Sequence, residues 1–357
     1  MTSCIEPTSL LPGEITKRVD HRISELLDDD ATRWAAVDPD LEEPLWSLSQ
    51  LVLAGGKRLR PAFCYWAFIG AGGDPDDPAV IDGCAALELL HTFALIHDDI
   101  MDGSCRRRGM DAVHHDHARR HAAASWSGES RRFGEGVGIL VGDLAFVYAD
   151  IVLADAPREA WQVFNELRLE LSVGQYLDLL GTARRDATPQ RSATTCRYKS
   201  AKYTVERPLH LGVALAGTAR LGELSGPLSA YGLPLGEAFQ LRDDLLGAFG
   251  DPAVTGKPVG DDLGAGKPTF LSALARSRAS GPSAELLRSR IGQGELSGGE
   301  LSELQAVLES TGARREVEAR IDRLIDAARG ALDGLRLEGG ATQALGALAA
   351  FVAGRSH

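Results

Sequence analysis

The pattern of hydrophobic and polar residues along the chain is helical almost throughout. Apolar residues recur every three or four positions, and the alternating runs rich in Val, Ile and Thr that indicate strands are scarce. The segments with the helical period are residues 15–29, 44–54, 79–102, 138–154, 158–180, 196–217, 225–246 and 313–335. Glycine and proline mark joints between helices, as at residues 71–75 and 280–282. The pattern therefore predicts an all-α protein.

Two segments lack this period and are rich in small or polar residues. We expect residues 119–135 and residues 292–299 to form exposed loops. Neither segment is long enough to separate two domains, and the chain shows no internal repeat. We therefore expect residues 1–357 to form one domain, a single large helical bundle around a central cavity, with residues 1–12 flexible.

Composition and charge exclude several classes of function. Hydrophobic residues make up 44% of the 357 residues, which is enough for a sizeable core. The formal net charge of −12 argues against a nucleic-acid binder, because such proteins use basic patches to displace counterions. The five cysteines are odd in number and have no paired spacing, so neither a disulfide framework nor a zinc site is expected.

The sequence carries no signal for a membrane location. Residues 1–14 lack a basic segment followed by an apolar one, so no signal peptide is expected. Residues 136–156 are interrupted by Asp143 and Asp150, and residues 341–354 are too few to cross about 30 Å of hydrocarbon. We therefore expect a cytoplasmic protein with reduced cysteines and no membrane span.

Candidate chemistry begins with the sequence HDDIMD at residues 97–102, which follows the apolar segment 84–96. Asp98 and Asp102 are four residues apart, so on a helix they share one face with Cβ atoms about 5–6 Å apart. Carboxylates at a helix C-terminus oppose the macrodipole, so we expect their removal to relieve repulsion when no cation is bound. Such oxygen ligands suit Mg²⁺, which takes its remaining ligands from water and phosphate. The alternative is a solvated acidic helix end, which leaves the preceding apolar segment unexplained.

A second acidic pair, Asp243 and Asp244, lies far downstream and also follows an apolar helical segment. Two such pairs facing each other would hold several Mg²⁺ ions and one diphosphate. Cations accompany them: Lys57 and Arg60 are three residues apart on one expected helical face, and residues 106–108 are all arginine. Each cation alone is most simply an ion-pair partner. Together they suit the binding of two separate diphosphates.

Several motifs occur in a fixed order between about residues 50 and 270. They are GGKRLRP (55–61), ELLHTFALIHDDIMD (88–102), RRG (107–109), GILVGD (138–143), GQYLD (174–178), YKSAKYT (198–204) and FQLRDDLLGAFGD (239–251). In this set the chain resembles the trans-isoprenyl diphosphate synthase family, and most of all the bacterial geranylgeranyl diphosphate synthases. The resemblance implies the helical isoprenoid synthase fold. It also implies a prenyltransferase that joins isopentenyl diphosphate head-to-tail to dimethylallyl, geranyl or farnesyl diphosphate and releases diphosphate.

The resemblance implies a role for each matching residue. The carboxylates implied at the site of three Mg²⁺ ions, which Mn²⁺ could replace, are Asp98, Asp99, Asp102, Asp243 and Asp244, with Asp98, Asp102 and Asp243 as direct ligands. The cations implied to bind the allylic diphosphate are Arg107, Lys199 and Lys257. The residues implied to bind isopentenyl diphosphate are Lys57, Arg60, His91 and Arg108. The neutral dipoles of Ser200 and Gln240 are implied to stabilise the carbocation. Without the motif around it, His91 would more simply be a buried core histidine.

Product length and one departure from the family pattern complete the prediction. On a helix, Ala94 lies one turn below Asp98 and Leu90 two turns below, while Phe93 borders the same stripe. An aromatic residue at this position resembles synthases whose main product is geranylgeranyl diphosphate (C20), with farnesyl diphosphate (C15) as runner-up and a C25 product possible. The alternative is that Phe93 is ordinary core packing. Gly247 stands where the family's second motif usually has a third aspartate, so the metal geometry there is in question.

Two other functions remain open at this point. A class I terpene cyclase would share the fold and the first motif, but it would lack GGKRLRP and carry an Asn/Ser/Glu metal motif that is not visible here. A non-catalytic partner subunit of a prenyl synthase would tend to lose its aspartates, and the first motif is complete. By the same resemblance, and because its apolar helices exceed what one core buries, we expect the chain to form a homodimer.

Overall fold

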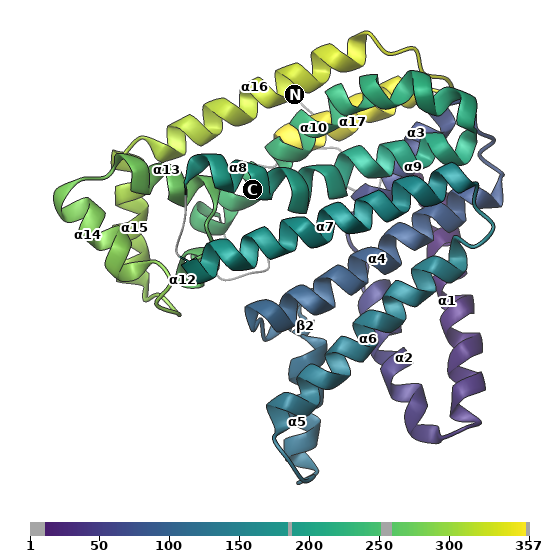
Figure 1. Ribbon diagram of the computed structural model, residues 1–357, viewed down its shortest axis with the longest axis horizontal. Helices are drawn as coiled ribbons and strands as arrows, with labels where there is room; N and C mark the ends of the chain where they lie inside the picture. Colours follow the sequence, from purple (N-terminus) through teal and green to yellow (C-terminus); the bar gives the residue numbers. More distant parts are fainter. Residues whose placement is uncertain (1–10, 185–187, 251–258, 355–357) are drawn as a thin grey trace.

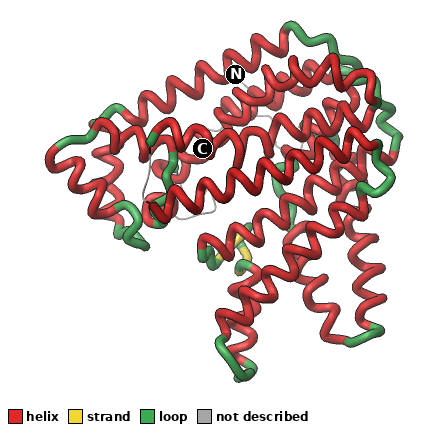
Figure 2. The backbone as a smooth tube through the Cα atoms, viewed as in Figure 1, coloured by secondary structure: helices red, strands yellow, loops and turns green. Residues whose placement is uncertain are grey.

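The computed structural model describes residues 11–184, 188–250 and 259–354, and it is helical almost throughout (Figures 1 and 2). The N-terminal half contains α1 (Gly13–Ala35), η2 (Pro39–Leu41), α2 (Glu42–Leu53), α3 (Leu59–Gly70), α4 (Pro78–Asp102), α5 (Val113–Ala123), α6 (Ser130–Val152) and α7 (Arg158–Arg184). The C-terminal half contains α8 (Pro189–Thr195), η3 (Cys196–Glu206), α9 (Arg207–Ala216), α10 (Thr218–Phe249), α12 (Asp261–Gly264), α13 (Phe270–Arg278), α14 (Gly281–Arg290), α15 (Gly298–Ser310), α16 (Ala313–Asp333) and α17 (Ala341–Gly354). The all-α prediction is confirmed.

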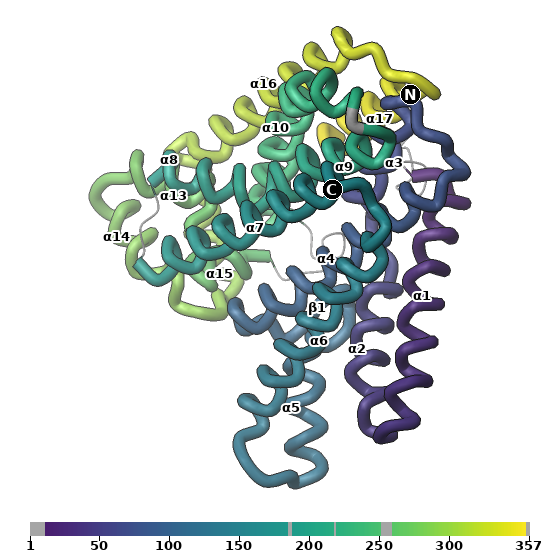
Figure 3. The backbone as a smooth tube through the Cα atoms, turned by 45° about the vertical axis from the view of Figure 1, so that its right-hand side comes forward, coloured from purple at the N-terminus to yellow at the C-terminus, as the bar shows by residue number. Residues whose placement is uncertain are grey.

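Long helices form the main body, and two helical pairs project from it. The hairpin of α1 and α2 and the end of the hairpin of α5 and α6 point to the same side of the body (Figures 1 and 3), and an ion pair between Glu43 and Arg120 joins α2 to α5. In the body, α10 packs against α16, η3 and α9, while α4 packs against α6 and α3. Within the described residues, the strands form one short antiparallel hairpin, β1 (Arg106–Arg107) with β2 (Met110–Asp111).

One apolar core connects these elements. It extends from Leu11 in the N-terminal segment to Val352 in α17, and it includes much of α4. The single domain stays a prediction, and this continuous core is consistent with it. Of the stretch predicted to be flexible, residues 1–10 lie outside the described residues, and Leu11 is buried. Helix α4 is long and apolar enough to cross a membrane by length and composition alone, but 67% of that window is buried in the protein, as in a core helix.

Three expectations about local structure were wrong. Residues 119–135 are not one exposed loop, because α5 continues to Ala123 and α6 begins at Ser130. The predicted helix 196–217 is divided into η3, a π-helix, and α9. Lys57 and Arg60 do not share a helical face, because α3 begins only at Leu59, after Arg58 in a left-handed conformation with φ of 45°. The loop predicted at residues 292–299 is confirmed up to Ser297, where a capping box starts α15.

Candidate active site

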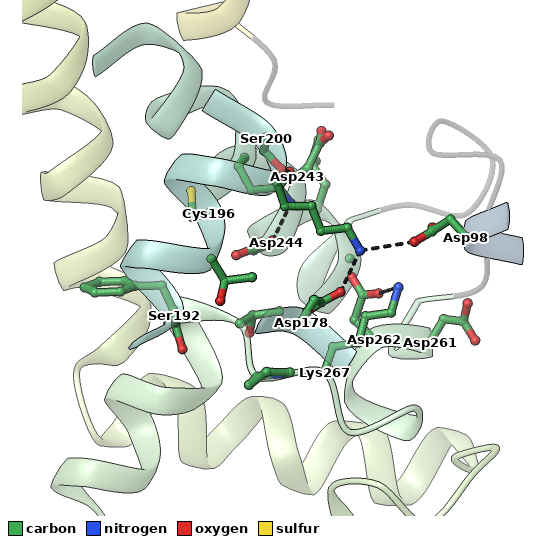
Figure 4. A pocket seen from close by; sticks show the side chains of 18 of the residues that line it. Asp98, Asp178, Ser192, Cys196, Ser200, Asp243, Asp244, Asp261, Asp262 and Lys267 are labelled. Atoms are coloured by element: carbon green, nitrogen blue, oxygen red, sulfur yellow. Dashed lines mark hydrogen bonds and ion pairs between the residues drawn. The ribbon is translucent and has the colours of Figure 1, made fainter. Parts of the chain in front are cut away.

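A cavity of about 450 Å³ opens where α4, α7, η3, α10 and the α12–α13 segment meet (Figure 4). Its lining is rich in charged and polar side chains, which contrasts with the apolar core beside it. The predicted site residues that line it are Lys57, Asp98, Lys199, Ser200, Gln240, Asp243 and Asp244. Side chains far apart in the sequence, including Asp98, Asp178 and Asp262, surround the same space in Figure 4. The two acidic motifs therefore face one cavity.

Two lysines of the cavity each have an ammonium group between two carboxylates, of which only Asp102 lies outside the cavity lining. The Lys199 Nζ atom lies 3.1 Å from Asp98 Oδ1 and 2.6 Å from Asp178 Oδ2. The Lys267 Nζ atom lies 2.7 Å from Asp102 Oδ2 and 3.5 Å from Asp262 Oδ1. Each lysine thus links an aspartate of α4 to an aspartate from another element.

These ion pairs decide the charge state of the site. Burial alone would raise the pKa of Asp98, but Lys199 and Lys267 outweigh it and hold that pKa below its ordinary value. Burial likewise lowers the pKa of Lys267, yet the carboxylates of Asp262 and Asp102 raise it above its usual range. Because the pKa of Asp98 is lowered and the pKa values of Lys199 and Lys267 are raised, these three groups are charged at neutral pH. The expectation that the first motif is a site of unrelieved repulsion was wrong, because the lysines already neutralise it.

Asp244 behaves differently from the other carboxylates. Its side chain is buried, and burial raises its pKa to about 8 even though Gln240 donates a hydrogen bond to it. The Gln240 Nε2 atom donates to Asp244 Oδ1 at 2.8 Å, and the Ser200 hydroxyl donates to Gln240 Oε1 at 2.6 Å. Because Asp244 accepts from the amide nitrogen, the amide oxygen of Gln240 must face Ser200. The three side chains form one oriented hydrogen-bonded chain along the cavity wall.

The second acidic motif has Gly247 where the family usually has its third aspartate, and the carboxylate of Asp262 lies beside that glycine. Helix α10 continues through Gly247 to Phe249 without a break near Gly247, while Asp251 lies outside the described residues. A Cβ atom at Gly247 would lie 2.9 Å from Asp262 Oδ2, and the Gly260 amide donates to the Gly247 carbonyl at 2.8 Å. The carboxylate of Asp262 therefore occupies the space beside the glycine.

Two predicted residues lie together just outside the cavity. Asp99 is buried, and its carboxylate accepts hydrogen bonds from Arg107, one of them at 2.9 Å from the Nε atom. The Arg107 Nη2 atom also lies 3.8 Å from Asp98 Oδ2. Asp99 therefore places Arg107 against the first motif, and the structure does not bring Asp99 itself into the cavity lining.

A second, basic cluster, Arg60, His91 and Arg108, lies along α4 about two helical turns before Asp98. The Arg60 guanidinium carbon lies 4.2 Å from the centre of the Tyr203 ring, and His91 Nδ1 lies 3.2 Å from the Tyr203 hydroxyl. Burial, followed by the charges of Arg60 and Arg108, lowers the pKa of His91 well below its ordinary value, so the imidazole is neutral. The buried Arg60 Nε atom has no hydrogen-bond partner among the described residues. An anion with several acceptor atoms suits such a cluster.

The residues proposed to limit product length lie along α4 below the first motif. Leu90 is fully buried, while Phe93 and Ala94 are half-buried. The Phe93 ring packs against His97, with ring centres 4.6 Å apart, and against Phe146 of α6 at 4.9 Å. Phe93 is thus part of an aromatic cluster between α4 and α6. Lys257, the remaining predicted site residue, lies outside the described residues.

Comparison with known proteins identifies the family. The sequence model of the polyprenyl synthetase family matches residues 42–308. The short chain isoprenyl diphosphate synthase of Methanothermobacter thermautotrophicus is 33% identical over 334 residues, which cover 92% of this chain and 95% of that protein. The chain belongs to the polyprenyl synthetase family.

A further relative and a solved structure are also prenyl diphosphate synthases. The geranylgeranyl diphosphate synthase of Mycobacterium tuberculosis is 32% identical over 295 residues, 80% of this chain and 78% of that protein. The crystal structure of geranylgeranyl pyrophosphate synthase from Corynebacterium glutamicum, complexed with isoprenyl diphosphate and magnesium, matches with a TM-score of 0.89 and 36% identity, covering 96% of this chain and 99% of that chain. The protein is therefore a prenyl diphosphate synthase, a prenyltransferase that elongates prenyl chains.

The structure adds individual site roles for three residues to which the sequence assigned none. Asp178 and Asp262 each pair with a cavity lysine, and Lys267 pairs with the first motif. Asp178 is the last residue of the GQYLD motif, so the sequence contained a signal for it. The Asp261–Asp262 pair and Lys267 follow a segment rich in glycine, where no helical period indicated which way a side chain would point.

Proposed function

We propose that this synthase condenses isopentenyl diphosphate with allylic diphosphates in a Mg²⁺-dependent reaction, and that geranylgeranyl diphosphate (C20) is its main product. One observation carries the proposal: Asp98 and Asp243, from motifs far apart in the sequence, line a single cavity together with Lys199 and Lys267. Dimethylallyl, geranyl and farnesyl diphosphates are the proposed allylic substrates.

The residues of the cavity fit Mg²⁺. Carboxylate oxygens are hard ligands, and the lysine ammonium groups between them mark positions where a cation is stabilised. No three Asp, Glu, His or Cys side chains of the described chain lie close enough to hold an ion by themselves, so substrate oxygens would complete the coordination. We assign Asp98, Asp102 and Asp243 as ligands of three ions. When bound, the ions neutralise the diphosphate and make it a better leaving group.

The remaining residues act on the allylic substrate directly. Lys199, Lys267 and Arg107 would exchange their carboxylate partners for diphosphate oxygens and bind the leaving group through charge-assisted hydrogen bonds. Cleavage of the C1–O bond leaves an allylic carbocation. The oriented dipoles of Ser200 and Gln240 stabilise positive charge without forming a covalent bond to it. No side-chain nucleophile is needed.

The basic cluster would hold the second substrate. Arg60, His91 and Arg108, with Lys57 at the cavity edge, offer several donors to the diphosphate of isopentenyl diphosphate, and Arg60 Nε is a buried donor still to be satisfied. The substrate's double bond attacks C1 of the carbocation and forms the new carbon–carbon bond. The positive charge then lies on the isopentenyl unit, and the carbon next to the charged one loses a proton, in our proposal to the departing diphosphate.

Product length is assigned from α4. The growing chain extends from Asp98 along the face that carries Ala94 and Leu90, and the Phe93 ring at its border is fixed by His97 and Phe146. A helical turn rises about 5.4 Å, so a ring at this depth stops the chain after a few isoprene units. We assign Phe93 as the residue that sets the C20 limit.

We also propose that two copies of this chain form a homodimer through α6 and α7. Both helices leave large apolar side chains exposed at helical spacing: Leu140, Val147 and Ile151 on α6, and Leu169, Val173 and Tyr176 on α7. Leu140 is 62% exposed and Leu169 63% exposed, which is unusual for leucines of a helical bundle. Sedimentation should give twice the chain mass of 38.0 kDa. Leu140→Glu should shift the protein towards the monomer. A wild-type protein that sediments as a monomer would refute the proposal.

Product analysis tests the assigned reaction. Purified protein, Mg²⁺ and isopentenyl diphosphate are incubated with each allylic diphosphate separately, and the prenyl products are identified by mass spectrometry. We expect all three starters to yield mainly the C20 product, and EDTA to abolish the reaction. A main product of C15 or C25 would overturn the length assignment alone. Failure to extend any starter would overturn the reaction assigned to the cavity.

A further inference from the structure

We propose that Arg58 is a positioning residue for isopentenyl diphosphate binding, and that it acts through an ion triad with Glu88 of α4 and Asp20 of α1. This inference rests on the proposed function, because it assumes that Lys57, Arg60, His91 and Arg108 hold that diphosphate. Arg58 itself is buried away from the cavity, so it contributes by fixing its neighbours.

The triad has the geometry of a structural anchor. The side chain of Arg58 is 5% exposed and that of Glu88 is 3% exposed. The two ends of the guanidinium fork separate: Nη1 donates to Glu88, while Nη2 donates to Asp20 Oδ1 at 2.7 Å and to the Val52 carbonyl at 3.1 Å. Three acceptors from three elements therefore fix one planar group.

The backbone at Arg58 shows why an anchor is needed. Arg58 has φ of 45°, a left-handed conformation that is unfavourable for a residue with a side chain. Gly55 and Gly56, with φ of 82° and 148°, precede it, so the chain turns sharply between α2 and α3. Such a turn has little intrinsic preference for one geometry, and the pairs made by the Arg58 side chain select the observed one.

The turn and the triad adjoin each member of the proposed diphosphate site, through the sequence or through a contact. Lys57 immediately precedes Arg58, and Arg60 lies in the first turn of α3 directly after it. Glu88 is three residues before His91, so both lie on one face of α4. Arg108 donates to the Leu51 carbonyl at 2.8 Å, and its guanidinium lies 3.5 Å from the position of a Cβ atom on Gly56. A shift of this turn would move the binding groups relative to one another.

The triad also gives a role to α1, which lies before the segment that matches the polyprenyl synthetase family. Asp20 is the residue of α1 in the triad, and it is 38% exposed at its side chain. A second ion pair joins the same two helices away from the turn: Arg22 Nε lies 2.7 Å from Asp82 Oδ1. This second pair provides a matched control, because it connects α1 to α4 without contacting Arg58.

The test compares Asp20→Asn with Asp82→Asn in the full-length protein. Binding of isopentenyl diphosphate is measured by titration calorimetry without allylic substrate, and KM is measured for both substrates. We expect Asp20→Asn to weaken isopentenyl diphosphate binding on the order of tenfold, because a small displacement of binding groups has effects of this size. The KM for farnesyl diphosphate and kcat should stay within about twofold of wild type, and Asp82→Asn should change neither KM.

Arg58→Lys provides a second variant that keeps the charge but loses the planar fork. It should show the same selective weakening, since an ammonium group cannot hold Glu88 and Asp20 in the same arrangement. The positioning role is wrong if the folded variants leave isopentenyl diphosphate binding unchanged, raise both KM values equally, or match the Asp82→Asn control. A parallel Lys57→Ala variant separates the two claims. If Lys57→Ala binds isopentenyl diphosphate like wild type, the assigned diphosphate site fails, whatever the triad does.

Discussion

The buried carboxyl of Asp244 should make the stability of the ligand-free protein depend on pH in a defined direction. Its pKa is about 8 in the folded protein, against an ordinary value of 3.8 in an unfolded chain. Because the folded pKa is the higher one, the stability linked to this group is fully present below about pH 4 and is lost as the pH rises through 8. Between these two pKa values, the carboxyl is protonated in the folded protein and ionised in the unfolded chain.

Asp244→Asn removes this dependence, because the amide is neutral at every pH and its oxygen still accepts from Gln240. The difference between pKa values of 3.8 and about 8 corresponds to a linked free energy on the order of 5 kcal/mol, most of which develops above pH 5. The variant should therefore gain roughly 3–4 kcal/mol of stability over wild type when the pH is raised from 5 to 8.

Urea unfolding curves of both proteins in EDTA, recorded at pH 5 and pH 8, measure this gain. EDTA is needed because a bound metal ion would favour the ionised carboxylate and reduce the effect. If the two proteins lose or gain stability in parallel between these pH values, Asp244 is ionised in the folded protein and its assigned environment is wrong.

Three further changes address the metals and product length. Asp102→Ala should reduce turnover by orders of magnitude and slightly lower the melting temperature of the ligand-free protein, because Lys267 loses its closer partner; near-normal turnover would contradict the metal assignment. Gly247→Asp should change turnover only modestly, since the carboxylate of Asp262 can rotate away from the new side chain; a loss beyond about tenfold, equal to 1.4 kcal/mol, would show that Asp262 is needed where it lies. Phe93→Ala should lengthen the main product by about one isoprene unit, the length of roughly one helical turn, and unchanged products would mean that another residue ends the chain's path.

Much of the fold was predictable because it depends on local pattern. The helical period and the apolar segments placed the long helices, and the motif order placed Asp98 and Asp243 in one site. Helix ends were less predictable: the segment after residue 119, rich in arginine and serine, reads as a polar loop, yet its first residues complete α5 and bury His121. Spacing also failed for Lys57, because a left-handed residue separates it from α3.

The ion pairs of the site could not be predicted in this way. Lys199 pairs with Asp178 and Asp98, and Lys267 with Asp102, across long stretches of chain. A sequence shows that cations and carboxylates are present, but any lysine could pair with any nearby carboxylate. Only the packing of α4, α7, η3 and the α12–α13 segment selects the partners. The same holds for Asp262, whose approach to α10 depends on the absence of a side chain at Gly247.

In the proposed mechanism, one cavity uses carboxylates for the metal ions and lysines for the diphosphate. A crystal structure of the protein with Mg²⁺ and inorganic diphosphate tests it most directly. We predict metal density at Asp98, Asp102 and Asp243, with the Lys199 and Lys267 ammonium groups moved from their carboxylate partners to diphosphate oxygens. Diphosphate bound elsewhere, or lysines still paired with Asp98 and Asp102 while the ligand is present, would contradict the claim.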